Sequence, residues 1–174
     1  IYSADRSQLI GSFTHRNNPS GSYFATEMVK GEELVIEYNP PRSKDTGLLV
    51  KIYQVHYIYK DVYEELKMGS GPCEVNVNCP EGANWQNEKR SVAKILLKDG
   101  NGSYVCTGTL INNLRQDSVP YFLTARHCGS GATASQFAQW IFYFNYESPD
   151  CEDPLEDPPS QTITGSTLVS EAPD

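Results

Sequence analysis

The sequence lacks any long hydrophobic run, any excess of positive charge and any internal repeat. No uninterrupted apolar stretch reaches about 18 residues, so no membrane-spanning helix is expected. The net charge of −8 argues against nucleic acid as a partner, because binding to phosphate groups needs an excess of cationic side chains. The opening residues, Ile1-Tyr2-Ser3, show no charged and then apolar secretory leader, and a processed or incomplete chain would open in the same way.

The residues that are present fit a globular β-protein. A hydrophobic fraction of 39% and a charged fraction of 21% are typical of soluble domains. The two tryptophans and eleven tyrosines favour β-strands. A chain of 174 residues suffices for one ordinary domain or two small ones.

The five cysteines are too widely spaced for paired C-x-x-C zinc motifs, so no metal site is expected from them. A disulfide framework fits the spacing better and indicates a secreted, extracellular protein. The odd count leaves two alternatives open. One cysteine pairs with a residue outside this sequence, or one thiol is free and buried.

Residues 1–60 are expected to form a small, incomplete β-sandwich-like unit that lacks its first strands. Alternating apolar residues and turn clusters predict its strands. Residues 61–71 are polar and glycine-containing, and they are interpreted as a linker. The strands expected in the first unit cover residues 8–13, 23–28, 33–38 and 47–59.

Residues 72–174 are expected to form a second β-unit. The tetrad Asp99-Gly100-Asn101-Gly102 predicts a hairpin between two strands. Residues 130–136 are interpreted as a loop with a possible short helix. The acidic and proline-containing stretch 147–160 is interpreted as an extended surface loop. The strands expected in this unit cover residues 91–98, 104–112, 121–125, 138–146 and 161–170.

The segment Tyr121-Phe122-Leu123-Thr124-Ala125-Arg126-His127-Cys128 carries the strongest chemical signal. An apolar strand ends at a histidine that is followed by a cysteine, and Cys106 lies upstream. If Cys106 and Cys128 are bonded, the imidazole of His127 sits beside a covalent cross-link, which suits a general base that must keep its geometry. A zinc site would need two further ligands beside His127 and Cys128, and none lies at a familiar spacing. We therefore expect His127 to be catalytic, with no cofactor and no metal.

A set of segments downstream of residue 72 strengthens this interpretation. They are Pro72 to Gly82, Ser91-Val92-Ala93, Cys106 to Leu110, Tyr121 to Gly129, Trp140 to Cys151 and Gly165-Ser166-Thr167. Their combination resembles the chymotrypsin-fold, trypsin-like serine proteases, and within them the bacterial lysyl endopeptidase-like enzymes. The resemblance spans residues 72–174. It implies an all-β fold in which this region is the first barrel, or half, of a chymotrypsin-like double barrel.

The resemblance also implies how the remaining cysteines pair and where the other catalytic groups lie. Cys79 should pair with Cys151, and Cys73 with a cysteine beyond Asp174. No Gly-Asp-Ser-Gly or Gly-Ser-Ser-Gly turn occurs in the chain, so the nucleophilic serine and the oxyanion hole are expected beyond Asp174. Counted without gaps, Asp174 falls about two positions short of the family's catalytic aspartate. The orienting carboxylate is therefore Asp174 or a residue just after it.

Two functions remain open at this point. The first is a secreted serine endopeptidase, of which this chain is a fragment that is inactive alone and that acts on protein or peptide substrates together with the rest of the protease domain. The resemblance suggests cleavage after lysine or another basic residue. The second is a non-catalytic binding or adhesion module built on a protease-like half-barrel. The acidic loop 147–157 is expected to be solvated, with a calcium site as its alternative.

Overall fold

The computed structural model describes residues 1–17, 23–40, 50–57, 73–100, 102–152, 158 and 160–172. The chain divides into two compact units, Ile1–Ser12 with Met28–Gly69 and Phe13–Glu27 with Ser70–Asp174. The expected linker, 61–71, lies outside the described residues, so the domain boundaries read from the sequence remain predictions. No helix in the described ranges is long and apolar enough to cross a membrane.

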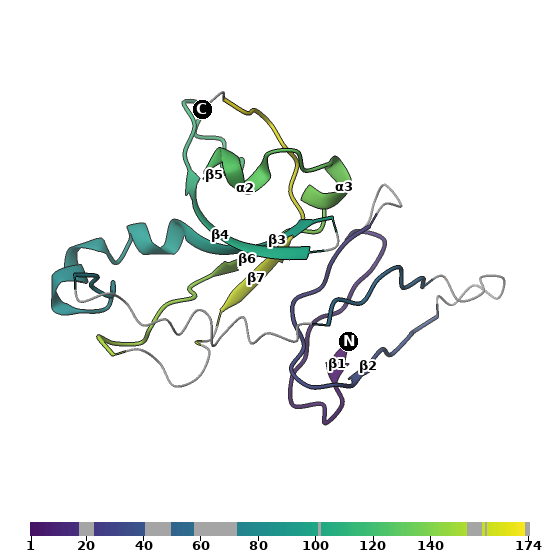
Figure 1. Cartoon of the computed structure of the whole chain (residues 1–174). Coiled ribbons are helices and arrows are strands. Elements are labelled where there is room, and N and C mark those ends of the chain that lie inside the picture. The colour runs from purple at the N-terminus through teal and green to yellow at the C-terminus, as the bar shows by residue number, and fades with distance from the viewer. Residues whose placement is uncertain are drawn as a thin grey trace. The chain divides into compact units, whose positions relative to one another are not determined.

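The second unit is built on one antiparallel sheet of five strands in the order β5-β4-β3-β6-β7 (Figure 1). Only the neighbours β3 and β4 form a tight hairpin, while longer connections join the others. The five strands are β3 (Val92–Asp99), β4 (Gly102–Ile111), β5 (Tyr121–Thr124), β6 (Ile141–Phe144) and β7 (Gln161–Thr164).

The hairpin between β3 and β4 forms where the sequence predicts it. Asp99 pairs with Gly102 at the turn, and Ile95 pairs with Cys106 in the middle of the ladder. Gly100 has φ +52°, a left-handed conformation that glycine adopts without steric cost. Asn101, the other turn residue, lies outside the described residues.

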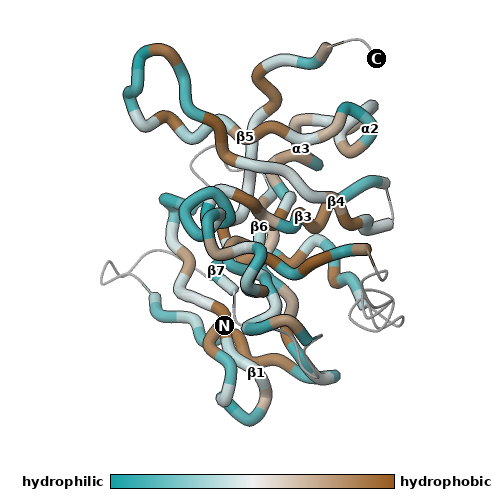
Figure 2. Tube along the Cα trace, turned by 90° about the vertical axis from the view of Figure 1, so that its left-hand side faces the viewer, coloured by the Kyte–Doolittle hydropathy of each residue, from teal (hydrophilic) through white to brown (hydrophobic). Residues whose placement is uncertain are grey.

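The core of this unit covers one face of β3. Alternate side chains of a strand point to the same face, so Ala93, Ile95 and Leu97 are buried together. Aromatic residues from β6 and from the segment before it pack against them. Figure 2 shows the hydrophobic character of β3 and β6 in brown. The buried aromatic members of the cluster are Phe137, Trp140 and Phe142.

The structure confirms the all-β class expected from the sequence. Within the described part of the chain, β5 and β7 are the two edge strands of the sheet, and no backbone ladder joins them. The expected closed barrel is therefore an open sheet in these residues, and closure remains a prediction. Closing a sheet requires its edge strands to hydrogen-bond to each other or to a further strand.

Residues 1–60, which the sequence predicts to be a first unit, contain much less regular structure in their described part than the alternating pattern predicts. Their described strands are β1 (Tyr2–Ser3) and β2 (Leu34–Val35), which pair with each other. The strand expected over 33–38 is thus shortened to two residues. The strands expected over 8–13 and 23–28 are not formed, apart from one isolated bridge between Tyr2 and Leu9. The described part of the strand expected over 47–59, residues 50–57, is not assigned to a strand either.

The described residues of the second unit include four short helices, and most of them are not apparent from the pattern. Two 3-10 helices, Pro80–Trp85 and Glu88–Ser91, precede β3 and are not predicted by the sequence. The helix α2 (Arg126–Gly129) follows β5 directly. The helix α3 (Ala134–Phe137) matches the short helix considered possible over 130–136. The strands β6 and β7 are shorter than the ranges 138–146 and 161–170 expected for them.

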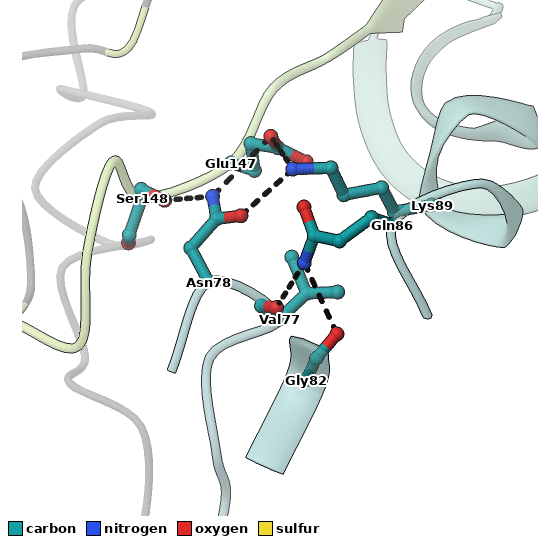
Figure 3. Close-up of polar contacts among 7 residues, drawn as sticks. All are labelled: Val77, Asn78, Gly82, Gln86, Lys89, Glu147 and Ser148. Carbon is teal, nitrogen blue, oxygen red and sulfur yellow. Dashed lines mark hydrogen bonds and ion pairs between the residues drawn. The ribbon is translucent and has the colours of Figure 1, made fainter. Parts of the chain in front are cut away.

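The segment before β3 is bound to the segment after β6 by a disulfide and a group of polar contacts. Cys79 and Cys151 are bonded, as the family resemblance implies. Beside them, Lys89 Nζ lies 2.7 Å from Glu147 Oε1 and donates to Asn78 Oδ1 at 2.7 Å (Figure 3). The side-chain nitrogen of Asn78, Nδ2, in turn donates to the same carboxylate oxygen, Glu147 Oε1, at 3.3 Å. Residues 78–89 are therefore held against the start of the acidic loop.

Candidate active site

The histidine segment begins where β5 ends against β4. Gly108 lies opposite Thr124 in the ladder between these two strands. A side chain at Gly108 would overlap the Phe122 ring and the Leu123 carbonyl, so only glycine lets the two strands approach this closely. Thr124 Oγ1 also donates to the Thr107 carbonyl at 2.9 Å. These contacts fix the direction in which the chain leaves the sheet.

The chain then turns at once into α2, which carries His127. The Cys128 amide donates to the Ala125 carbonyl at 3.0 Å, and the Ser130 amide donates to the Arg126 carbonyl at 2.9 Å. The sequence places His127 at a strand end, whereas the structure places it in the first turn after the strand. The side chain is exposed, so the imidazole is accessible to a partner group or a substrate.

The imidazole lies beside a disulfide. Cys106 on β4 and Cys128 on α2 are bonded, as the sequence led us to expect, and their Cα atoms are 6.3 Å apart. A ring nitrogen of His127 and the two sulfur atoms all lie within 4.8 Å of one another. Bonded sulfurs are not thiolates, which are the form in which cysteine binds zinc. The cluster therefore acts as a cross-link that fixes α2 to the sheet.

The helix α3 supports this arrangement from inside. Phe137 and Trp140 pack on each other with ring centroids 4.6 Å apart. A side chain at Gly129, the last residue of α2, would press on both of their rings. The helix starts with a capping box, in which Thr133 Oγ1 accepts from the Gln136 amide and the Gln136 side chain accepts from the Thr133 amide. The end of α2 therefore packs against the rings of Phe137 and Trp140.

The segment after β7 returns to the histidine helix, and the sequence gives no sign of the contact it makes there. In Figure 1 this yellow segment runs past α3 towards α2. The Gly165 amide donates to the Trp140 carbonyl at 2.8 Å, and the Ser166 amide donates to the Phe137 carbonyl at 3.0 Å. Farther along, Arg126 Nε lies 2.9 Å from a carboxylate oxygen of Glu171. A surface ion pair between residues so far apart in sequence has no periodic or motif signature.

The other residues considered from the sequence are less closely involved. Asp174 and the Gly69-Ser70-Gly71 turn lie outside the described residues. Gly129-Ser130-Gly131 forms the turn at the end of α2. Cys73 is exposed and has no disulfide partner in the described part of the chain. No cluster of three metal-ligand side chains involves the described residues of the acidic loop.

Comparison with known proteins identifies the family of this chain. The family model of the lysyl endopeptidase C-terminal domain matches residues 68–174. The curated lysyl endopeptidase of Pseudomonas aeruginosa is 32% identical over 129 residues, which is 68% of this chain. The chain belongs to the lysyl endopeptidase family. The chymotrypsin-fold protease family expected from the sequence is therefore confirmed.

This lysyl endopeptidase-family chain covers only part of its relative. It spans 28% of the length of the Pseudomonas aeruginosa protein. The match includes the histidine helix, the disulfide between Cys106 and Cys128, and the segment after β7, all of which lie within residues 68–174. The region that matches the protease family therefore contains the candidate site.

Proposed function

We propose that this chain is the part of a secreted serine endopeptidase that carries the general base, and that His127 is that base. The complete protein hydrolyses peptide bonds after lysine or another basic residue. The nucleophilic serine and the oxyanion hole belong to the part of the protein beyond Asp174. The orienting carboxylate is Asp174 or a residue just after it.

The observation that supports the proposal most directly is the setting of His127. The imidazole is exposed on a helix that is bonded covalently to the central sheet through the Cys106–Cys128 disulfide. A general base must reach a hydroxyl group while it keeps its own orientation through two proton transfers. Accessibility together with a rigid backbone satisfies both requirements.

The proposed reaction has two halves, and His127 transfers protons in both of them. The imidazole of His127 takes the proton of the serine hydroxyl as the serine oxygen bonds to the scissile carbonyl carbon. The imidazolium then gives that proton to the leaving amine when the C–N bond breaks. Water then replaces the amine, and its oxygen bonds to the acyl carbon as His127 takes its proton. The imidazolium returns a proton to the serine oxygen when the bond between that oxygen and the acyl carbon breaks, which releases the acid and restores the serine. The carboxylate holds the imidazole in the tautomer that both halves need.

Secretion and substrate preference rest on two separate supports. The two disulfides, Cys79–Cys151 and Cys106–Cys128, favour an oxidising extracellular compartment, because thiols are kept reduced in the cytosol. The preference for lysine rests on family membership alone, since a pocket for the substrate side chain is expected in the later part of the protein.

The test is a peptidase assay on the complete protein, on the complete protein carrying His127→Ala, and on the 174-residue chain. Peptide substrates should differ only in having lysine, arginine or leucine before the scissile bond. We expect His127→Ala to lower kcat by about 10⁴-fold or more, because members of a catalytic triad act as a unit. The 174-residue chain should be inactive, since a base accelerates nothing without a hydroxyl group to activate.

Near-normal kcat in the His127→Ala protein would remove His127 from the mechanism. A complete protein that hydrolyses none of the peptides, although folded, would favour the alternative of a protease-like binding module. Thermal unfolding of the His127→Ala protein is the control for folding. Its Tm should be close to that of the unchanged protein, because the disulfide and not the exposed imidazole secures the end of β5.

A further inference from the structure

We propose that the ion pair between Arg126 and Glu171 is a positioning contact for catalysis. It holds the segment after β7 against the histidine helix and so sets where the orienting carboxylate meets the imidazole. The inference deepens the proposed function and rests on the role given there to His127. Neither Arg126 nor Glu171 is expected to touch the substrate.

The ion pair joins two functionally placed segments. Arg126 is the residue directly before His127, and Glu171 lies three positions before Asp174. The guanidinium Nε and the carboxylate oxygen are 2.9 Å apart, which is a normal charge-assisted hydrogen bond. A contact at this point fixes the histidine helix and the approach of the later chain relative to each other.

Among the described residues, polar contacts hold the segment after β7 at its start, at Gly165 and Ser166, and again at Glu171. It leaves α3 at Ser166, whose amide and hydroxyl group both donate to the Phe137 carbonyl at 3.0 and 3.1 Å. Within residues 167–172, the hydrogen bonds and ion pairs to the rest of the described chain come from Glu171 alone. The path between Ser166 and Glu171 is therefore held at its two ends.

Apolar packing does not replace the missing polar attachments. The side chains of Leu168 and Val169 are 51% and 75% exposed. Burial is the usual source of order for an extended segment, and these two side chains provide little of it. Among the described residues, the ion pair is consequently the contact that holds the later part of the segment.

The length of chain after the last attachment shows why this matters. Measured from Ser166, an extended chain to Asp174 reaches up to about 28 Å, but measured from Glu171 it reaches only about 10 Å. The ion pair thus reduces the volume in which the carboxylate can be found. Because a misplacement of about 1 Å can cost about 100-fold in rate, loss of this constraint should appear in kcat.

The experiment is a double-mutant cycle in the complete protein with Arg126→Gln, Glu171→Gln and both together. We expect each single change to lower kcat about tenfold, below the limit of about 100-fold for a displacement of this size. KM should stay within about twofold, because substrate contacts are not altered. The losses of the two single variants should be less than additive in the double variant, since both changes remove the same ion pair.

The chain offers a matched control. Arg115 Nε lies 3.2 Å from a carboxylate oxygen of Asp117, in an ion pair in the connection between β4 and β5. Arg115→Gln removes the same chemical group from the same kind of surface pair, and it should leave kcat and KM unchanged. The exchanged pair Arg126→Glu with Glu171→Arg should recover activity to within about threefold, because the attraction is restored with reversed sign.

The outcomes separate the two proposals. If His127→Ala is inactive while Arg126→Gln behaves like Arg115→Gln, the positioning role is wrong and the proposed function stands. Additive losses in the cycle would also overturn the inference, since the two side chains would then act independently. A Glu171→Gln loss as large as that of His127→Ala would overturn it as well, because Glu171 would itself be the catalytic carboxylate. An active His127→Ala protein would remove the basis of both proposals.

Discussion

The strand β3 and the segment 50–57 carry comparable apolar patterns, yet only β3 belongs to a sheet. In β3, Ile95 is 0% exposed and has strands on both sides, β4 and β6. In the first unit, Ile52 is 60% exposed and no strand pairs with its segment in the described residues. The two isoleucines therefore have the same chemistry and opposite surroundings.

The difference shows that an alternating apolar pattern gives a segment an apolar face but does not supply the neighbouring strand with which that segment would pair. An apolar face becomes a strand in a stable sheet only where neighbours complete its hydrogen bonds and cover its side chains. β3 has both, because β4 and β6 flank it and Phe137 and Trp140 lie on its apolar face. The predictions below test how far this contrast extends.

The largest effect should come from truncating the two isoleucines in turn. Ile95→Ala should lower the free energy of unfolding by about 3–4 kcal/mol, because it removes buried methyl groups and leaves a cavity. Ile52→Ala should change it by less than about 0.5 kcal/mol, as is usual for exposed side chains. Denaturant unfolding of the 174-residue chain, followed by the fluorescence of Trp140 in the core, measures both.

Equal effects of the two substitutions would break the comparison. If Ile52→Ala were as destabilising as Ile95→Ala, the segment 50–57 would have to be packed in solution. A small effect of Ile95→Ala would instead mean that the face of β3 is less tightly covered than its 0% exposure indicates. The slope of unfolding against denaturant should not change, since neither substitution alters the surface that unfolding exposes.

A smaller effect is expected from adding one methyl group at two glycines of β4. Gly108→Ala should lower the free energy of unfolding by about 2 kcal/mol, because the new Cβ overlaps the Phe122 ring and the Leu123 backbone. Gly102→Ala is the matched control. The three atoms nearest to its new Cβ all belong to the side chain of Tyr104, at 3.3 Å or more, and this exposed ring can move.

If the two glycine variants were equally stable, β5 would not lie as close to β4 as the ladder indicates. Gly108→Ala should also disturb the histidine helix, because β5 leads directly into α2. In the complete protein this predicts a loss of peptidase activity that Gly102→Ala does not share. The same unfolding measurement and the peptide assay described above check the two consequences.

Much of the second unit could be predicted because its signals are local or covalent. The turn at Asp99-Gly100-Asn101-Gly102 fixes the register of β3 and β4, and both strands lie within one or two residues of the expected ranges. The first unit was predicted less well. Its expected strands at 8–13 and 23–28 depend on pairing between distant segments, which no local pattern encodes.

The candidate site shows the same division. The position of His127 beside the disulfide Cys106–Cys128 follows from the sequence, because a covalent cross-link places its neighbours. The start of α3 also had a readable signal, the capping box from Thr133 to Gln136. The ion pair that brings Glu171 to the histidine helix had none, since surface charges carry no periodicity that would indicate a distant partner.

The smallest effect concerns the first unit, where polar contacts and not burial hold the described turn after β1. Asp5 Oδ1 accepts from the Ser3 hydroxyl at 2.6 Å, from the Ser7 amide at 3.0 Å and from the Ser7 hydroxyl at 2.8 Å. Led by the bond from Ser3, these hydrogen bonds lower the pKa of Asp5 from 3.8 to about 2. They favour the charged carboxylate, so they are fully present above pH 3.8 and are lost as the pH falls through about 2.

An NMR titration of the carboxyl carbon of Asp5 tests this prediction. The midpoint should lie near pH 2, and the amide resonances of Ser7 and Gln8 should shift with the same midpoint, because their positions depend on the turn. Ser3→Ala should raise the pKa of Asp5 more than Ser7→Ala does, since the Ser3 hydroxyl contributes most and Ser7 keeps its amide bond. A midpoint near 3.8 in the unchanged chain would mean that the turn is not held by these bonds. The first unit would then lack even this local order, and its contrast with the sheet would be greater than the structure indicates.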